Sequence, residues 1–467
     1  MVDLNKIRKI YFIGIGGIGM SALARYFLFH GKEVSGYDKT ETILTKSLVR
    51  EGIPVHYTED LSLAPSDAGL IVYTPAIPKE HKELLFYQAN KYPVLKRSQV
   101  LGAITKSSFN ICVAGTHGKT TVSTMIAHLL RDSGYGCNAF LGGIAVNYNS
   151  NFWSDARNVC VIEADEYDRS FLQLSPDIAV VTAMDPDHLD IYHTAAAVEQ
   201  AFLDFSGKLK MGGMLISKSG LSRDMDFKVD RHIRYSLKDK MSDAFADNIR
   251  IREGGYRFDF LTKNESIKDV ELNMGGLHNV ENAVAAISVA KQLEISDEKI
   301  VKAVGNFRGV KRRFEYRVFP REKSKPNMLV YIDDYAHHPE ELSALIRSAR
   351  NMFGERKCAV IFQPHLYSRT RDFVEGFAES LDLADEVVLL PIYPARELPI
   401  SGITSGMIAE KMSHAKVHLM TKDEMLNWLQ TSFMGQAKKQ GWVLITAGAG
   451  DIDALVEPIQ KIIEKTN

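Results

Sequence analysis

The stretch Val113-Ala114-Gly115-Thr116-His117-Gly118-Lys119-Thr120-Thr121 decides how the rest of this chain is interpreted. An apolar run from Phe109 to Val113 comes before it and predicts a buried strand, and apolar residues at helical spacing follow it from Val122 to Leu130. A glycine-rich turn between a strand and a helix presents unsatisfied backbone N–H groups at the positive end of the helix dipole, which suits a phosphate. The stretch therefore predicts a phosphate-binding loop.

Two side chains of this loop have the chemistry that a nucleotide needs. Lys119 is placed to reach the terminal phosphates, and the Thr120 hydroxyl is placed to hold Mg²⁺. The full Walker pattern requires glycine at position 113, where this chain has Val113, so a shorter Gly-x-x-Gly-Lys-Thr-Thr remains. A plain strand-to-helix turn with a surface lysine is the alternative. The predicted strand and helix on either side favour the phosphate loop.

Length and composition describe an ordinary globular chain. The 467 residues predict three domains at about 150 residues each. The formal net charge of −1 attracts the chain neither to nucleic acid nor to a membrane surface. No apolar run approaches the roughly 18 residues of a membrane span, and no signal-peptide pattern opens the chain, so we expect a cytoplasmic protein without membrane insertion. Cys112, Cys160 and Cys358 fall in apolar runs and are expected in the core.

A second glycine-rich turn lies near the N-terminus, in Gly14-Ile15-Gly16-Gly17-Ile18-Gly19-Met20-Ser21. It follows a short apolar strand and opens a predicted helix, and Asp38 closes the next predicted strand. This G-x-G-x-x-G pattern lets a diphosphate approach the backbone. It is weak evidence for a nicotinamide cofactor in particular, and a packing role for the glycines is the alternative.

Carboxylates follow two predicted strands beyond the phosphate loop. The strand from Asn158 to Ile162 leads into Glu163, and a carboxylate beside a phosphate loop is where a Mg²⁺ ligand is needed. The strand from Ile178 to Thr182 is followed by Asp187 and His188, which suggest a second metal position. A polar turn is the alternative there, because Asp-Pro is also turn chemistry.

Two further groups of polar residues close the middle of the chain. His278 and Asn282 lie four residues apart in a predicted helix and share one face, where asparagine could bond to a purine edge. A surface pair without a ligand fits the spacing equally well. The run that contains Arg312 and Arg313 is either a solvated basic face or a group that reaches a phosphate across an interdomain cleft.

Polar side chains also follow strand ends in the last third of the chain. The predicted strands from Met328 to Ile332 and from Cys358 to Phe362 lead into segments that contain His337, His365 and Arg369. In open α/β sheets, ligands bind just beyond the carboxyl ends of the strands. We therefore expect these three side chains to share one rim, although a lone histidine is more often structural.

Together these motifs resemble the Mur ligase superfamily, over all three expected domains and in the expected order. The segments that carry the resemblance are the Ala-Gly-Thr-His-Gly-Lys-Thr-Thr loop, Glu163-Ala164-Asp165-Glu166, Asp187-His188-Leu189-Asp190, His278-Asn279-Val280-Glu281-Asn282-Ala283, Arg312-Arg313-Phe314 and Asp333-Asp334-Tyr335-Ala336-His337-His338-Pro339. The most discriminating piece, Phe362-Gln363-Pro364-His365 with Tyr367-Ser368-Arg369-Thr370, looks like the alanine-adding branch and not like the relative that recycles murein tripeptide.

The resemblance implies an α/β fold with three domains. Residues 1–106 would form a Rossmann-like domain for the UDP-sugar, 107–314 a central P-loop ATPase-type domain, and 315–467 a Rossmann-like domain that closes on ATP and the amino acid. The implied activity is an ATP-dependent amide ligase that joins L-alanine to the carboxylate of UDP-N-acetylmuramate through an acyl phosphate, in peptidoglycan precursor synthesis. The alternatives are a murein-peptide ligase that adds a larger peptide and, from another class, an NAD(H)-binding protein built on the first domain.

The resemblance further implies small-molecule partners, no nucleic acid, and a monomer or homodimer. ATP would act with Mg²⁺ at two sites, with Mn²⁺ as a substitute. The UDP-sugar would contact Gly14, Gly16, Gly17, Ile18, Gly19, Met20, Ser21 and Asp38. ATP would contact Gly115, Thr116, His117, Gly118, Lys119, Thr120, Thr121, His278, Asn282 and Asp334.

The implied metal ligands are Thr120, Glu163 and His188. The implied catalytic residues are Lys119, His188, Arg312, Arg313, His337, His365 and Arg369, and the amino acid would be held by Tyr335, His337, His365 and Arg369. The chain also departs from the pattern. Leu366 stands where other members can carry a basic residue, which leaves one fewer candidate contact for the amino acid.

Overall fold

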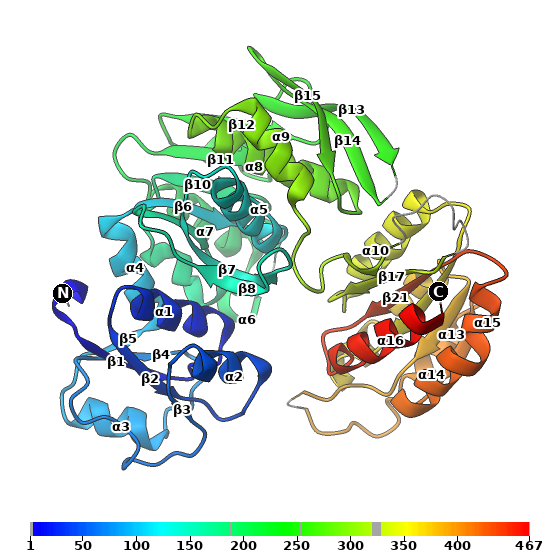
Figure 1. Cartoon of the computed structure of the whole chain (residues 1–467), viewed down its shortest axis with the longest axis horizontal. Helices are drawn as coiled ribbons and strands as arrows, with labels where there is room; N and C mark the ends of the chain where they lie inside the picture. The colour runs from blue at the N-terminus through cyan, green and yellow to red at the C-terminus, as the bar shows by residue number, and fades with distance from the viewer. Residues whose placement is uncertain (1–2, 187–188, 253, 320–327, 396, 467) are drawn as a thin grey trace. The chain divides into compact units, whose positions relative to one another are not determined.

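The chain folds around three β-sheets, as a computed structural model shows (Figure 1). The structure describes residues 3–186, 189–252, 254–319, 328–395 and 397–466. By contacts between residues, the chain divides into two compact units. One comprises Met1–Asp247, Asp259–Val270 and Glu281–Phe307, and the other comprises Asn248–Phe258, Glu271–Val280 and Arg308–Asn467.

The first sheet has five strands in the order β3-β2-β1-β4-β5, and all of its pairs are parallel. The sheet and its helices comprise β1 (Lys9–Ile13), α1 (Ile18–Phe29), β2 (Glu33–Tyr37), α2 (Ile43–Arg50), β3 (Val55–His56), β4 (Leu70–Tyr73), α3 (Lys82–Ala89), β5 (Val94–Lys96) and α4 (Arg97–Ser107). Gly31, with φ of +72°, follows the end of α1 and turns the chain into β2. The order places the first glycine-rich turn directly after the central strand β1.

The second sheet has ten strands in the order β15-β14-β13-β12-β11-β10-β6-β9-β7-β8. The sheet and its helices comprise β6 (Phe109–Ala114), α5 (Lys119–Asp132), β7 (Asn138–Ala145), β8 (Ser150–Trp153), β9 (Val159–Glu163), β10 (Ile178–Val181), α6 (Leu189–Tyr192), α7 (Ala195–Ser206), β11 (Met214–Lys218), β12 (His232–Ser236), β13 (Ala244–Arg252), β14 (Gly255–Thr262), β15 (Ser266–Leu272), α8 (Leu277–Gln292) and α9 (Asp297–Asn306). Strand β6 lies between β10 and β9, and both pairs are parallel. The phosphate loop and Glu163 therefore leave neighbouring strands at the same edge of the sheet.

The third sheet has six strands in the order β16-β17-β21-β18-β19-β20. The sheet and its helices comprise β16 (Glu315–Val318), β17 (Val330–Asp334), α10 (Pro339–Met352), β18 (Lys357–Phe362), α11 (Tyr367–Asp372), α12 (Val374–Leu381), β19 (Glu386–Leu389), α13 (Gly406–Lys411), β20 (Lys416–Leu419), α14 (Lys422–Trp428), α15 (Met434–Ala437), β21 (Trp442–Ala447) and α16 (Asp453–Thr466). Its strands are parallel except β16, which pairs antiparallel with β17. Pro339 is the first residue of α10, a position where its fixed φ suits the helix and its missing N–H costs no hydrogen bond.

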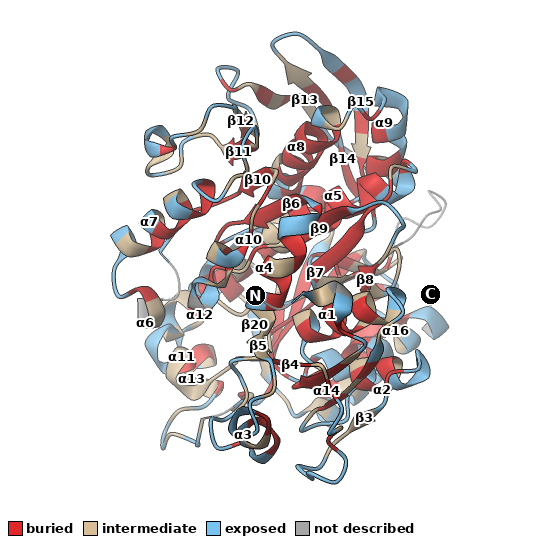
Figure 2. Cartoon of the chain, turned by 90° about the vertical axis from the view of Figure 1, so that its left-hand side faces the viewer, coloured by how far each residue is buried: buried red, intermediate tan, exposed pale blue. Residues whose placement is uncertain are grey.

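The core explains the continuous apolar runs of the sequence. Strands β6, β9 and β10 are buried because helices cover parallel sheets on both faces, and Figure 2 also shows helix α8 largely buried. The predicted burial of Cys112, Cys160 and Cys358 is confirmed, and Cys137 is buried as well. Burial raises the pKa of all four thiols, which makes them packing groups and not nucleophiles. In the described part of the chain, each helix is too short or too polar to span a membrane.

Candidate active site

The phosphate loop has the backbone that its glycines predict. Gly118 begins α5 with φ of +81°, and Gly115 has φ of +142°. A Cβ atom at Gly115 would lie 2.1 Å from Oγ1 of Thr182, so only glycine fits at this point. Thr182 also donates a hydrogen bond to the carbonyl oxygen of His117, and Asp185 N donates to Oγ1 of Thr116 at 3.2 Å. The segment after β10 thereby holds the loop in a fixed shape.

Lys119 is buried against an acidic residue. Its Nζ atom donates to Oε1 of Glu166 at 2.9 Å, and the two side chains are 18% and 1% exposed. Burial by itself lowers the pKa of Lys119, but the carboxylates of Glu166, Glu163 and Asp165 outweigh that effect and raise the pKa. Lys119 is therefore a fixed positive charge directly beside the phosphate loop. Glu166 belongs to a motif that the sequence singled out, but its contact with Lys119 was not predicted.

Thr120 and Glu163 lie together, as predicted for metal ligands. Thr120 Oγ1 donates to Oε1 of Glu163 at 2.8 Å, and Gly142 N donates to Oε2 of Glu163 at 2.8 Å. Burial raises the pKa of Glu163, while Lys119 and these hydrogen bonds oppose the rise. Across the described ranges, no three His, Cys, Asp or Glu side chains form a group that could hold a metal ion. His188, the third predicted ligand, lies outside the described residues.

The first glycine-rich turn is also shaped by close backbone approach. Gly16 N donates to Oδ2 of Asp38 at 2.7 Å, so Asp38 fixes the turn from the end of the neighbouring strand. Gly17 begins α1 without a side-chain cap, and Ser21 is turned inward, with its Oγ donating to Ile18 O at 2.9 Å. The N-terminus of α1 therefore keeps uncapped backbone donors, which is the arrangement that binds a diphosphate.

The first turn and Glu163 line one pocket of about 220 Å³. Gly17, Gly19, Gly142, Glu163 and Asp165 are among the residues that form its walls. Hydrogen bonds beside this pocket join α1, which packs with the first sheet, to β8 of the second sheet. Asn151 of β8 donates to the carbonyl oxygen of Ile18 at 2.5 Å and accepts from Nη1 of Arg25 at 2.8 Å. Ile18, Arg25 and Asn151 all belong to the same compact unit.

Arg97 is a pocket residue that sequence reasoning missed. It opens α4 directly after β5, and a Cβ atom at Gly19 would lie 2.6 Å from its Nη1 atom. Its Nη2 atom is 3.7 Å from Oδ2 of Asp165. The position of an arginine at a strand-to-helix junction was the available signal. The guanidinium stands beside the turn that is predicted to hold an anion.

Helix α8 brings Asn282 to the phosphate loop. A Cβ atom at Gly118 would lie 3.0 Å from Oδ1 of Asn282, so the amide lies against the start of α5. His278, one turn earlier, is exposed and lies close to Gly276. His117 is largely exposed as well, with Nε2 at 4.0 Å from Oδ2 of Asp185.

In the other unit, six predicted residues form one continuous group, called the basic row here: Arg312, Arg313, Tyr335, His337, His365 and Arg369. The ring of Tyr335 has Arg312 at 5.2 Å, Arg313 at 5.6 Å and His337 at 5.3 Å from its centre. The rings of His337 and His365 are 6.2 Å apart, and Arg369 Nη1 is 3.4 Å from Nδ1 of His365. The predicted rim is confirmed for its three members.

The pKa values of the two histidines of the basic row are lowered, which favours the neutral imidazole. Burial lowers the pKa of His337, against the opposing charge of Glu341. Burial also lowers the pKa of His365, and the charges of Arg369 and His337 add to the effect. A neutral imidazole can accept a proton, so either ring is suited to act as a base.

Arg312 and Asp334 are held firmly by their own sheet. Arg312 Nε lies 3.3 Å from Oδ2 of Asp333, and its Nη2 atom donates to the carbonyl oxygen of Gly448. Asp334 accepts from Phe314 N at 2.6 Å and from Ala336 N at 2.7 Å. Burial raises the pKa of Asp333 to about 7, although Arg312 opposes the rise. Arg312 is therefore fixed in direction as well as in charge.

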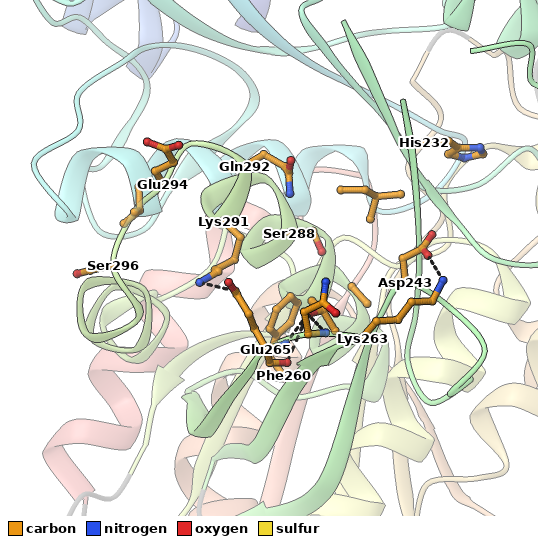
Figure 3. Close-up of a pocket in the computed structure, with 15 residues that line it drawn as sticks. His232, Asp243, Phe260, Lys263, Glu265, Ser288, Lys291, Gln292, Glu294 and Ser296 are labelled. Atoms are coloured by element: carbon orange, nitrogen blue, oxygen red, sulfur yellow. Dashed lines mark hydrogen bonds and ion pairs between the residues drawn. The ribbon is translucent and has the colours of Figure 1, made fainter. Parts of the chain in front are cut away.

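A larger cavity of about 630 Å³ lies elsewhere, between the strands β12 to β14 and the end of α8 (Figure 3). Its two lysines, Lys263 and Lys291, are paired with carboxylates. Lys263 lies 3.0 Å from Asp243, and Lys291 lies 2.8 Å from both Glu265 and Asp297. No residue predicted for the site lines it. Its size therefore does not make it the catalytic pocket.

Comparison with known proteins gives three family matches in the order of the chain. The family described as "Mur ligase family, catalytic domain" matches residues 9–109, "Mur ligase middle domain" matches 113–290, and "Mur ligase, glutamate ligase domain" matches 312–450.

Individual relatives agree with these matches. The "UDP-N-acetylmuramate--L-alanine ligase" of Flavobacterium psychrophilum is 46% identical over 99% of this chain and 100% of the relative. The crystal structure of UDP-N-acetylmuramate-alanine ligase from Thermotoga maritima is similar with a TM-score of 0.82 and 26% identity, over 98% of this chain and 100% of that one. A murein peptide ligase from Psychrobacter arcticus is similar in fold, with a TM-score of 0.65 and 22% identity over 98% of each chain. On these matches and on the geometry of its loops, the chain belongs to the Mur ligase family.

Proposed function

We propose that this chain joins L-alanine to the carboxylate of UDP-N-acetylmuramate, with conversion of ATP to ADP and phosphate through an acyl phosphate. Relatives of this name that match the whole chain support the choice of substrates. The structural observation that supports it most is the shared pocket. Glu163, which contacts Thr120 of the phosphate loop, lines the same space as Gly17 and Gly19 of the first turn. A diphosphate on one turn and a triphosphate on the other would thus bring the muramate carboxylate toward the γ-phosphate.

The phosphate loop is assigned to ATP. Backbone donors from Gly115 to Thr121 would hold the phosphates, and Lys119 would neutralise charge as the phosphoryl group moves. Asn282 lies against this loop and is assigned to the adenine with His278, while Asp334 is assigned to the ribose.

A Mg²⁺ ion fits the donor set of the phosphate loop. The hydroxyl of Thr120 and the carboxylate of Glu163 are 2.8 Å apart and are hard oxygen donors, as Mg²⁺ prefers. Two protein ligands would leave the other positions to water and to the phosphates of ATP. When bound, the ion would neutralise charge on the transferred phosphate. A second ion near His188, and Mn²⁺ as a substitute, remain proposals from the sequence.

The first glycine-rich turn is assigned to the UDP-sugar. The uncapped N-terminus of α1 would bind the diphosphate, with Gly14 to Ser21 around it and Asp38 fixing the turn. Arg97 is added to this set, because its guanidinium stands over Gly19.

The basic row is assigned to the amino acid and to the leaving phosphate. Arg369 offers a planar fork that suits the alanine carboxylate, with Tyr335 and the two histidines around it. His337 or His365 would take a proton from the amine as it attacks the acyl phosphate. Arg312 and Arg313 would add positive charge while phosphate leaves. Domain boundaries near residues 106 and 314, a cytoplasmic location and a monomer or homodimer complete the proposal.

Phosphate release in a three-substrate assay tests this function. We expect release only when UDP-N-acetylmuramate, L-alanine and ATP are all present. Release that continues when L-alanine is omitted would contradict the proposal. A second arm replaces L-alanine with a murein tripeptide. Faster release with the tripeptide would instead assign the chain to the peptide-adding branch.

A further inference from the structure

Hydrogen bonds join two loops of the third sheet, the loop after β18 that leads to Arg369 and the loop after β19. The two loops follow the parallel neighbours β18 and β19, and an isolated parallel bridge between His365 and Tyr393 continues the pairing beyond both strands. Tyr393 N donates to Pro364 O at 2.9 Å, and Leu366 N donates to Tyr393 O at 2.9 Å. The rings of His365 and Tyr393 are stacked with centres 5.7 Å apart. The loop after β19 is thus part of the support for the basic row.

Glu397, on the loop after β19, caps the short helix that carries Arg369. Its Oε2 atom accepts from Ser368 N at 3.0 Å, and its Oε1 atom accepts from the Ser368 hydroxyl. The Tyr367 backbone N–H donates to the same carboxylate. The residue before α11 is Leu366, which offers no side-chain acceptor of its own. The first donors of α11 are therefore satisfied from 29 residues away.

The capped segment also holds a strained residue. Leu366 has φ of +71° and ψ of +135°, a conformation that residues other than glycine adopt at a cost. Such a conformation persists where several contacts fix it together. Here the bond to Tyr393 fixes it on one side, and Thr370, whose N and Oγ1 both donate to Leu366 O, fixes it on the other. His365 directly precedes this residue and Arg369 follows three positions later in α11, so the backbone at Leu366 affects how their side chains lie relative to each other.

We infer that Glu397 is a positioning residue for the amino-acid site, which keeps Leu366 and α11 in the conformation that aims Arg369 and His365 at the acceptor. This rests on the assignment of the basic row to L-alanine under the proposed function. Glu397 would not touch the reacting atoms. Without its cap, α11 and Leu366 would sample other conformations, and the Arg369 fork would spend less time in place to bind a carboxylate.

Steady-state kinetics of Glu397→Gln in the full-length chain test the inference. The exchange keeps the size of the side chain and removes the charge that strengthens its hydrogen bonds. We expect the KM for L-alanine to rise about tenfold, with kcat and the KM values for ATP and UDP-N-acetylmuramate within about twofold. Ser368→Ala, which removes one donor and keeps the carboxylate, should raise the KM for L-alanine less, and it serves if Glu397→Gln does not fold.

Glu424→Gln is the matched control. Glu424 also accepts hydrogen bonds at a helix start, but within its own helix: it forms a capping box with Thr421 before α14, accepting from Thr421 N at 2.7 Å and from the Thr421 hydroxyl at 2.8 Å. It caps α14 and not α11, which carries Arg369. We expect this variant to keep all three KM values. If both variants lose thermal stability but only Glu397→Gln raises the KM for L-alanine, the change in KM comes from the position of the basic row and not from the loss of a helix cap.

The outcomes divide clearly. A selective rise in the KM for L-alanine in Glu397→Gln supports the inference. An unchanged KM for L-alanine, or an equal rise for all three substrates that Glu424→Gln also shows, overturns it. If the native chain uses an amino acid other than L-alanine, the proposed function fails by itself, and the same comparison with that acceptor still decides the role of Glu397.

Discussion

Replacing Lys119 by methionine separates catalysis from binding and from folding. The Nζ atom lies 2.9 Å from Oε1 of Glu166, and the two side chains are 18% and 1% exposed. Loss of one partner of such a buried pair leaves a buried charge and costs about 3–5 kcal/mol of folding stability. Loss of a donor to the transferring phosphoryl group lowers kcat by about 100–1,000-fold. Lys119→Met should therefore be less stable and almost inactive, with its affinity for UDP-N-acetylmuramate unchanged within about twofold.

A second exchange tells these effects apart. Glu166→Gln in the Lys119→Met background removes the uncompensated carboxylate, so denaturant unfolding should show most of the lost stability restored. Phosphate release should stay near zero, because the positive charge is still missing. Calorimetry measures the affinity of the same protein for UDP-N-acetylmuramate, which is assigned to the first glycine-rich turn. Restored turnover in the double variant, or a lost UDP-sugar site in the single one, would refute the reasoning.

Three further predictions concern the metal, the loop and pH. Glu163→Gln should raise the Mg²⁺ concentration for half-maximal phosphate release about tenfold or more, because it removes the carboxylate beside Thr120; an unchanged Mg²⁺ titration would argue against this site. Gly115→Ala should lower kcat/KM for ATP at least about 100-fold, since φ of +142° and the 2.1 Å approach to Thr182 exclude a Cβ atom; nucleotide binding close to that of the native chain would contradict it. Burial lowers the pKa of His337 from the ordinary 6.5, so kcat/KM for L-alanine should fall as the pH drops through that lowered value, below 6.5 and not above it. His337→Gln should remove this acidic limb, and a limb that stays would assign the proton transfer to another group.

The parts of the fold that the sequence predicts well are those with strong local signals. The strand from Phe109, the glycine turn and the helix after Lys119 all follow from hydrophobic spacing and glycine placement. Glu163 was expected just after a strand and is in fact the last residue of β9, a shift of one position. Because parallel strands end at the same edge of a sheet, order along the chain was enough to bring His337, His365 and Arg369 together.

Weak periodicity leaves the bounds of other elements undetermined by the sequence. Residues 219–269 are polar and loosely patterned, so the sequence predicts strands and loops there without their bounds. The strands are confirmed, because the stretch contributes β12, β13 and β14 and part of β15 to the ten-stranded sheet. Strand β20 (Lys416–Leu419) is a partly exposed edge strand, and its sequence has no continuous apolar run that would predict a strand. Such strands form because a sheet edge supplies their hydrogen bonds, and this support is not written in the local sequence.

Contacts over long sequence separations could not be predicted either. The partner of Lys119 is 47 residues away, and the cap of α11 comes from Glu397, 29 residues beyond Ser368. Arg97 reaches Gly19 because α4 starts at the same end of the first sheet as α1. Each of these contacts depends on which strands are neighbours in the sheet and on the side-chain rotamers that packing allows. A short sequence motif determines neither the strand order nor the rotamers.

The fastening of the first sheet to the second has a practical consequence for inhibitor design. Asn151 and Arg25 tie α1 to β8, and the first glycine turn shares a space of about 220 Å³ with Glu163, which contacts Thr120 of the phosphate loop. A bisubstrate compound therefore needs only a short tether. The tether converts the second binding event into an intramolecular one, at an effective concentration in the millimolar range for short linkers. Two weak fragments, a uridine diphosphate mimic and a phosphate mimic, would then gain avidity that neither has separately.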